Sequence, residues 1–332
     1  MMIDVFNHFS PKVYFDRLPA YIPGHPVLTA LPRLKTLMDV DARLRLLDEF
    51  GDLQQVLSLA QPPLELIAPP DKSPELARIS NDALAEMCRN HPDRFPAFIA
   101  TLPMNNVEAS LAEIDRSVKD LGARGIQVFT NVAGKPLSAP EFRPIFERMA
   151  AHDLPVWVHP MRTQQFADYA SEKESQDEIW FMFGWPYETT ACMTRLIFSG
   201  IFDALPNLKI ISHHMGGMIP YFEGKIKLTY SQIFFGTLDK SPAAERAGLK
   251  KQPLDYFKML YGDTALGEVG PTRCGHAFFG TDHCLFATDA PFDSEQGRAL
   301  TRNTIAAVNA LEIPKAEKDA IFAGNAKKLL RL

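Results

Sequence analysis

Short apolar runs, rich in β-branched and aromatic residues, alternate with longer amphipathic segments along the whole chain. The runs that we expect to form strands cover residues 2–8, 54–59, 95–102, 125–131, 154–159, 208–214, 258–264 and 284–289. The segments between them carry apolar residues at spacings of three and four, as one face of a helix requires. Near-continuous apolar strands that alternate with helices predict a parallel sheet covered by helices on both sides.

Eight such strands in a chain of 332 residues favour an α/β fold of the (β/α)8 or TIM barrel type, which typically needs ~250 residues. An open doubly wound sheet is the alternative, but no GxGxxG sequence follows the first strand. Residues 9–53 and 160–207 form connections too long for a single helix, and such connections often serve as lids or subunit contacts. No linker or repeat divides the chain, so we expect residues 1–332 to form a single domain.

Composition narrows the classes of partner. The chain is 46% hydrophobic and 23% charged, which is enough apolar material for a sizeable core. The net charge is −5 and no basic block is longer than a pair, so nucleic acid is not an expected partner. No apolar run approaches the ~18 residues of a membrane span, no signal peptide is apparent, and the four cysteines form no CxxC pair. We therefore expect a cytoplasmic protein with reduced thiols and no membrane association.

Polar residues end most of the predicted strands. They are His8, Asn131, His159, His213, His214, Asp263 and Asp289. The C-terminal ends of barrel strands converge on the face that carries the active site. A single buried histidine is more often structural, but histidines at three strand ends, with an aspartate at a fourth, are residues of the metal-ligand type. The joint pattern predicts a metal site, and Asn131 is a candidate substrate-binding residue at the same face.

Four sequence motifs support a more specific interpretation. The elements IDxxxHFxP, LPVWVHP, SHHMGGMIPYFEGKI and LFATDAPF occur in this order. Together they resemble the amidohydrolase-related decarboxylases, a group that includes aminocarboxymuconate semialdehyde, γ-resorcylate and 5-carboxyvanillate decarboxylases, and the likeness extends over nearly the whole chain. The resemblance implies a barrel of the metal-dependent hydrolase type. It also implies non-oxidative decarboxylation of a small aromatic or unsaturated carboxylic acid.

The same resemblance implies roles for individual residues. One divalent ion, zinc or manganese, would be held by His8, His159 and Asp289. His214 would be an acid/base residue that does not bind the metal. Two roles stay open for Asp289, since it would bind the metal and could also deliver the proton. His213 has no counterpart in these roles, and because adjacent residues of a strand face opposite ways we expect it to be structural.

One position departs from the family pattern, in which the first strand ends in HxH or ExH. Alternate side chains share a face of a strand, so positions 6 and 8 would carry the two ligands, but position 6 is Phe6. Asn7 could replace the missing ligand only if the strand end twists or bulges. Asp4 lies too deep, roughly 13 Å from His8 at about 3.3 Å per residue. Two alternatives therefore remain: a site that binds its metal more weakly, and a site that binds no metal.

Further candidates concern the substrate. Lys225, in the sequence GKI, stands where the resembling muconate enzyme has an arginine that reaches across a dimer interface. The resemblance therefore implies a homodimer and a cation for the substrate carboxylate, while a solvated surface lysine is the alternative. Trp180 lies in an aromatic stretch that could wall a pocket for a planar acid or pack at a subunit contact. Phe6 would border the same pocket.

Two other functions stay open from the sequence. The first is a hydrolase or hydratase acting on a lactone, enol acid or ring amide, because related barrels support several chemistries. The second is a metal-free binding protein, which Phe6 would suit. The retention of His159, His214 and Asp289 argues against this second alternative. The sequence thus predicts a decarboxylase whose partner is a small carboxylic acid.

Overall fold

The computed structural model describes residues 1–231 and 247–332, and its main strands lie in two parallel sheets. The first sheet has the order β1 (Met2–Phe9), β2 (Leu53–Leu59) and β3 (Ala97–Phe98). The second has the order β11 (Cys284–Leu285), β10 (Tyr261–Asp263), β9 (Ile210–Ser212), β8 (Val156–His159), β5 (Ile126–Phe129) and β4 (Ala100–Thr101). Every pairing within these two sheets is parallel, as the alternating pattern predicts.

Backbone hydrogen bonds join the two sheets into a ring. Only Ile99 separates β3 from β4, and its N–H donates to the carbonyl of Leu57 on β2 at 2.8 Å, so the two short strands act as one. At the other edge, the N–H of Val5 on β1 donates to the carbonyl of Phe286, directly after β11, at 2.9 Å. The ring therefore contains the eight predicted strands, and the TIM barrel is confirmed.

The fourth barrel strand ends earlier than predicted. We expected it to reach Asn131, but this residue begins a separate antiparallel hairpin of β6 (Asn131–Val132) and β7 (Lys135–Pro136). Ala133 and Gly134 form the turn, and both have positive φ angles, which two-residue hairpin turns often require. The prediction of extended backbone over residues 125–131 was therefore correct, but these residues belong to two strands, β5 (Ile126–Phe129) and β6, rather than to one.

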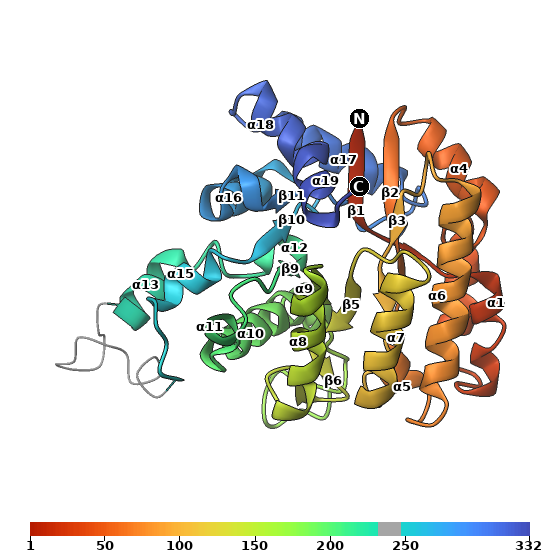
Figure 1. Ribbon diagram of the computed structural model, residues 1–332, viewed down its shortest axis with the longest axis horizontal. Helices are drawn as coiled ribbons and strands as arrows, with labels where there is room; N and C mark the ends of the chain where they lie inside the picture. The colour runs from red at the N-terminus through yellow and green to blue at the C-terminus, as the bar shows by residue number, and fades with distance from the viewer. Residues whose placement is uncertain (232–246) are drawn as a thin grey trace.

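Helices surround the barrel, as Figure 1 shows. The longer ones are α4 (Val40–Asp48), α6 (Ser73–Asn90), α7 (Val107–Lys119), α8 (Arg143–His152), α10 (Gly184–Phe198), α13 (Glu223–Ser231), α16 (Val269–Phe279) and α17 (Arg298–Asn309). The shorter ones are α1 (Lys12–Phe15), α2 (Val27–Ala30), α3 (Lys35–Met38), α5 (Leu64–Ile67), α9 (Ile179–Met182), α11 (Ile201–Ala204), α12 (His213–Gly216), α15 (Pro253–Phe257), α18 (Lys315–Asp319) and α19 (Asn325–Leu330). The predicted helical face of α7 packs inward, with Ile114 fully buried.

The strands are buried on both faces, which produces two apolar cores. One fills the barrel interior and includes Ile3, Val56, Trp157, Ile211 and Leu285. The larger one lies between the barrel and its helices. This double burial is the physical reason that the strand sequences are almost continuously apolar. No helix within the two described stretches combines the length and the apolar character needed to cross a membrane.

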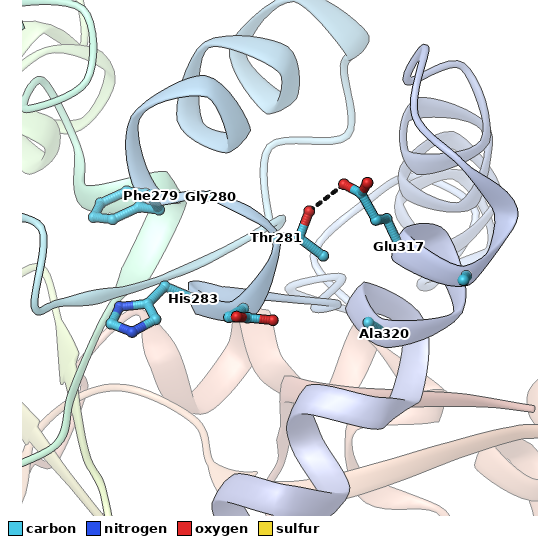
Figure 2. A pocket seen from close by; sticks show the side chains of 8 residues that line it. Phe279, Gly280, Thr281, His283, Glu317 and Ala320 are labelled. Atoms are coloured by element: carbon cyan, nitrogen blue, oxygen red, sulfur yellow. Dashed lines mark hydrogen bonds between the residues drawn. The ribbon is translucent and has the colours of Figure 1, made fainter.

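A surface hollow of about 620 Å³ lies beside the residues that lead into β11 (Figure 2). Its lining includes Thr281, whose hydroxyl donates to the carboxylate of Glu317 at 2.5 Å, and His276 contacts the same hydroxyl at 2.9 Å. These residues precede β11, so the hollow lies at the N-terminal end of the barrel strands. Residues at that end of a TIM barrel support stability rather than catalysis.

Candidate active site

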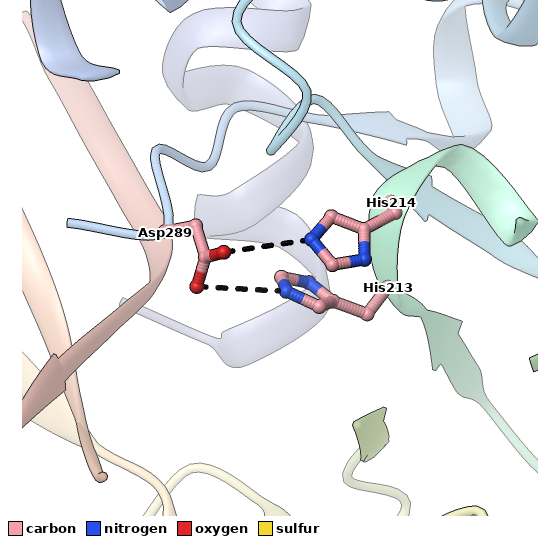
Figure 3. A group of neighbouring side chains, drawn as sticks. All are labelled: His213, His214 and Asp289. Carbon is pink, nitrogen blue, oxygen red and sulfur yellow. Dashed lines mark hydrogen bonds and ion pairs between the residues drawn. The ribbon is translucent and has the colours of Figure 1, made fainter. Parts of the chain in front are cut away.

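The carboxylate of Asp289, just past the end of β11, is the centre of a histidine cluster. Its Oδ1 lies 3.1 Å from Nε2 of His8 and 3.7 Å from Nε2 of His213, and its Oδ2 lies 3.5 Å from Nε2 of His214. Figure 3 shows the rings of His213 and His214 directed at this carboxylate. Burial by itself would raise the pKa of Asp289, but the neighbouring His213, His214 and His8 outweigh it and hold that pKa well below its ordinary value.

His213 and His214 both face the cluster, which corrects the expectation that these two neighbours face opposite ways. β9 ends at Ser212, and His213 continues the inward-facing series that begins with Ile211. His214 adopts φ 54° and ψ 52°, a left-handed conformation that turns its ring to the same side. The two ring centroids are consequently 3.9 Å apart. The rule that neighbours face opposite ways fails here because the strand has already ended.

Asp263 at the end of β10 fixes both histidines. Its Oδ2 accepts a hydrogen bond from Nδ1 of His213 at 2.7 Å, and its Oδ1 accepts one from the backbone N–H of His214 at 3.0 Å. Burial lowers the pKa of His213, but Asp263 and then Asp289 raise it to about 9. Burial and the adjacent His213 lower the pKa of His214, against the opposing effect of Asp289.

His159 at the end of β8 lies beside the cluster rather than against Asp289. Its ring centroid is 5.5 Å from that of His8 and 5.4 Å from that of His213. Its Nδ1 contacts the carbonyl of Pro160 at 2.6 Å, and its Nε2 lies 3.1 Å from the amide nitrogen of Gln61. Burial, and then the neighbouring His213 and His8, hold the pKa of His159 well below its ordinary value.

Phe6 lies among these histidines and is fully buried. Its ring centroid is 4.0 Å from that of His213, 4.8 Å from that of His8 and 5.8 Å from that of His159. The apolar ring therefore points into the barrel at the place where the resemblance predicts a ligand. It fills the space but offers no donor atom.

Asn7 does not replace the missing ligand, although β1 does contain the irregularity that this would require. The pairing of β1 with β2 shifts register between Asp4 and Asn7. The side-chain oxygen of Asn7 nevertheless accepts a hydrogen bond from Arg43 at 3.2 Å, and its nitrogen donates to the carbonyls of Asp4 and Val56 at 3.3 and 3.1 Å. The whole amide is thus engaged on the far side of the strand.

The donor set fits a divalent metal ion. His213, His214 and Asp289 each offer a ligand atom, and these atoms lie within 4.8 Å of one another. His8 adds a further imidazole nitrogen at 3.1 Å from Asp289. Among the described residues, Nε2 of His213 is a buried nitrogen without a hydrogen-bond partner, which is the condition expected of a metal ligand. Imidazole and carboxylate donors suit zinc and manganese.

The predicted substrate-binding residues lie at different distances from this cluster. Trp180 on α9 is half-buried and packs on Trp185 at 6.2 Å, and Trp185 in turn packs on His159 at 5.4 Å. The amide of Asn131 donates to the carbonyl of Met161 and accepts from the backbone of the β6–β7 turn, at 2.8 and 2.9 Å. Lys225 is exposed on α13, and this helix lies at the periphery of the molecule in Figure 1.

Three residues near the cluster were missed from the sequence. Gln61, in the loop after β2, contacts His159. Phe292, three residues after Asp289, packs on His8 with the ring centroids 5.3 Å apart, and its side chain is 42% exposed. Arg43 on α4 reaches the carbonyl of His8 from behind the strand. Only Phe292 has a signal in the sequence, because it belongs to the LFATDAPF motif.

Comparisons with known proteins agree with this arrangement. Residues 38–332 match the amidohydrolase family. The chain is 33% identical to a γ-resorcylate decarboxylase of Polaromonas sp. over 341 aligned positions, which cover 98% of this chain and 97% of the relative. A crystal structure of 2,6-dihydroxybenzoate decarboxylase complexed with 2,6-dihydroxybenzoate has a TM-score of 0.81 and 27% identity, and covers 99% of this chain and 98% of that chain.

A second solved structure includes a metal. It is a dihydroxybenzoic acid decarboxylase from Polaromonas sp. with bound manganese and the inhibitor 2-nitroresorcinol, with a TM-score of 0.79 and 29% identity, and covers 100% of this chain and 97% of that chain. The similarity therefore extends over nearly the whole chain. With sequence and fold in agreement along the chain, this protein belongs to the amidohydrolase family.

Proposed function

We propose that this protein is a carboxy-lyase that performs a metal-dependent, non-oxidative decarboxylation of a small hydroxylated aromatic acid. The observation that carries the proposal is the Asp289–histidine cluster at the C-terminal ends of the barrel strands. Its position corresponds to the catalytic face of a TIM barrel. The relatives act on γ-resorcylate and 2,6-dihydroxybenzoate, so acids of this kind are the first substrates to test.

The reaction requires a proton at the ring carbon that carries the carboxylate, before the bond to CO2 breaks. We assign this transfer to His214, whose side chain is 15% exposed while those of His8 and His213 are 1% exposed. Its Nε2 is 3.5 Å from Asp289, which can exchange a proton with it. Histidine suits this role because small shifts place its pKa near neutral pH.

One divalent ion, zinc or manganese, is the cofactor that we infer. His8, His159 and Asp289 are the ligands implied by the family resemblance, and His8 and Asp289 are in contact at 3.1 Å. When bound, the ion would supply a Lewis acid that polarises a substrate oxygen. The burial that keeps the pKa of His159 low favours its neutral form, which is the form that binds metals.

We further propose that two copies of the chain form a homodimer in which Lys225 of one copy receives the substrate carboxylate of the other. Exposed aromatic side chains support an interface near α9 and α13, notably Phe183 at 67% and Tyr221 at 80% exposure. Trp180 would form part of the wall around the planar substrate. Each copy would be one domain of residues 1–332, because the first strand, β1, pairs through Val5 with Phe286 after the last strand, β11, and so closes the barrel. The four free cysteines favour a cytosolic location.

The test is to incubate the metal-supplemented protein with a panel of hydroxybenzoates and muconate-type acids and to measure CO2 release. We expect release from at least one 2-hydroxylated benzoate, because its hydroxyl helps the ring accept a proton. The His214→Gln variant should retain binding of a product analogue but lose about 10²- to 10⁴-fold in rate, the contribution typical of a general acid. No release across the panel, together with opening of lactones, would instead establish a hydrolase.

A further inference from the structure

His213 is a buried residue whose second ring nitrogen, Nε2, faces the carboxylate of Asp289 at 3.7 Å without a hydrogen bond. Its side chain is 1% exposed, its Nδ1 is engaged by Asp263 at 2.7 Å, and its Nε2 has no hydrogen-bond partner among the described residues. A buried polar atom without a hydrogen-bond partner destabilises the folded protein. A metal ion that displaces the proton of Nε2 would remove this cost, because the ring would then donate to Asp263 through Nδ1–H and carry its lone pair on Nε2.

The surroundings of this nitrogen match those of a metal ligand. Metal-binding histidines generally donate their other ring N–H to a carboxylate, which fixes the ring and its tautomer, and Asp263 has this position here. Nε2 lies 3.7 Å from Oδ1 of Asp289, and Nε2 of His8 lies 3.1 Å from the same oxygen. Ligand atoms that share one ion at bond lengths of about 2.0–2.2 Å are separated by roughly 3.0–3.6 Å.

Phe6 explains why such a ligand is needed. Its ring occupies the position at the end of β1 where the resemblance predicts a donor, and it packs against the ring of His213 with the centroids 4.0 Å apart. It is fully buried and cannot be turned out of the barrel without opening the core. The cluster therefore lacks one donor on β1 and has one additional histidine directly beside that position, at the end of β9.

We propose that Nε2 of His213 supplies the metal ligand that Phe6 cannot. One ligand of the set would then come from the end of β9 instead of from the end of β1. The inference rests on the metal dependence included in the proposed function. His8, His159 and Asp289 would be shared with the family pattern, and the replacement of a donor at Phe6 by His213 would be particular to this chain. His214 keeps its assignment as the acid/base residue.

The experiment measures binding of Mn²⁺ to metal-depleted full-length protein by titration calorimetry, and counts coordinated histidine nitrogens by pulsed electron paramagnetic resonance on protein labelled with [15N]histidine. We expect the His213→Ala variant to bind Mn²⁺ more than ~100-fold more weakly, because even residues behind a ligand contribute 10- to 100-fold. It should also show one coordinated nitrogen fewer. The matched control is His276→Ala, which removes a histidine that contacts Thr281 beside the hollow at the opposite end of the barrel and should leave both readouts unchanged.

Two further variants keep the test independent of folding defects. Adding Phe6→His to the His213→Ala protein should restore Mn²⁺ affinity to within about tenfold of the wild type, because a donor at position 6 would serve the same coordination site. Wild-type affinity and an unchanged nitrogen count in His213→Ala would overturn the inference while leaving the decarboxylase proposal intact. A wild-type protein that takes up no Mn²⁺ would overturn the inference and the metal dependence together, and CO2 release would then decide the remaining activity.

Discussion

At the scale of single residues, Arg43 is a fully buried cation that supports the backbone of the cluster. Its guanidinium donates to the carbonyl of Thr36 and to the side chain of Gln55, both at 2.8 Å, and to the carbonyl of His8. Gln55 in turn donates to the carboxylate of Asp4 at 2.9 Å. A buried charge is tolerated only when hydrogen bonds satisfy it, and this network does so while holding the end of β1.

We predict that Arg43→Ala destabilises the protein by about 3–5 kcal/mol, the usual effect of removing one member of a buried charged network. Its partners, including the carbonyl of His8, would lose their donors. Urea unfolding of the two proteins measures the difference. The matched control is Arg45→Ala, an exposed position on the same helix, for which we expect a change within about 0.5 kcal/mol. Equal effects of the two substitutions would contradict the structural role of Arg43.

Asp4 gives a pH dependence of known sign. Burial raises its pKa to about 6, although Thr288 and Gln55 bond the carboxylate and oppose the shift. The pKa of Asp4 is higher in the folded protein than in the unfolded chain, so ionisation favours the unfolded state. The contribution of the protonated carboxyl to stability is therefore present at low pH and is lost as the pH rises through about 6. The loss attributable to Asp4 is on the order of 3 kcal/mol.

The measurement is urea unfolding between pH 4 and pH 7 for the wild type and for Asp4→Asn. We expect the stability of the variant, relative to the wild type, to increase with pH over this range, since the amide has no charge to bury. Asp16→Asn, at an exposed carboxylate paired with Lys12, serves as the control and should keep the wild-type slope. An unchanged slope in Asp4→Asn would show that another group is responsible.

At the scale of elements, the junction between β9 and α12 determines how the histidines are presented. His214 and Met215 are left-handed, and Gly216 and Gly217 follow with positive φ angles. The turn also packs closely on α10, because a Cβ at Gly217 would lie 2.5 Å from the carbonyl of Pro186. Both the conformation and the close approach require glycine at position 217.

We predict that Gly217→Ala is more destabilising than Gly280→Ala by at least about 1–3 kcal/mol, the cost of forcing extra atoms into a packed site. Both glycines have positive φ, +64° and +74°, but nothing lies within 4 Å of a Cβ at Gly280. Both alanine variants would therefore have an unfavourable positive φ, and only the one at position 217 would also clash with α10. Thermal and urea unfolding provide the measurement, and equal losses would indicate that α10 moves to accommodate the methyl group.

At the scale of the whole molecule, closure of the barrel brings together residues that are far apart in the chain. His8 and Asp289 are separated by 281 positions and meet at 3.1 Å. The aromatic side chains near α9 and the side chain of Lys225 on α13 are exposed on the surface and are not part of this buried contact. Their arrangement supports the proposal that a second copy of the chain completes each substrate site.

A mixing experiment tests that proposal. Lys225→Met and His214→Gln should each be inactive for decarboxylation alone, since one lacks the cation and the other the acid. If each site combines residues of two subunits, then unfolding and refolding the variants together should restore about a quarter of wild-type activity, because half of the dimers would be mixed and each would hold one intact site. Absence of recovery, with dimers present by size-exclusion chromatography, would place Lys225 and His214 of each site on the same subunit. An active Lys225→Met variant would remove Lys225 from the site.

The sequence by itself determined the order of strands and helices, the closed barrel and the family. These follow from local periodicity and from motifs, because a strand buried on both faces must be apolar wherever it lies. The same logic placed His8, His159, His214 and Asp289 at one end of the barrel, since parallel strands carry their C-terminal residues to the same face.

Only the tertiary structure decided how those residues meet. The left-handed turn at His214 brings His213 into the cluster, and Arg43, 36 positions away in the chain, holds the amide of Asn7 on the far side of β1. Both depend on contacts between distant segments, which local periodicity does not encode. The physical reason is that side-chain direction at the end of a strand is set by the packing and hydrogen bonds of its neighbours once the regular backbone has stopped.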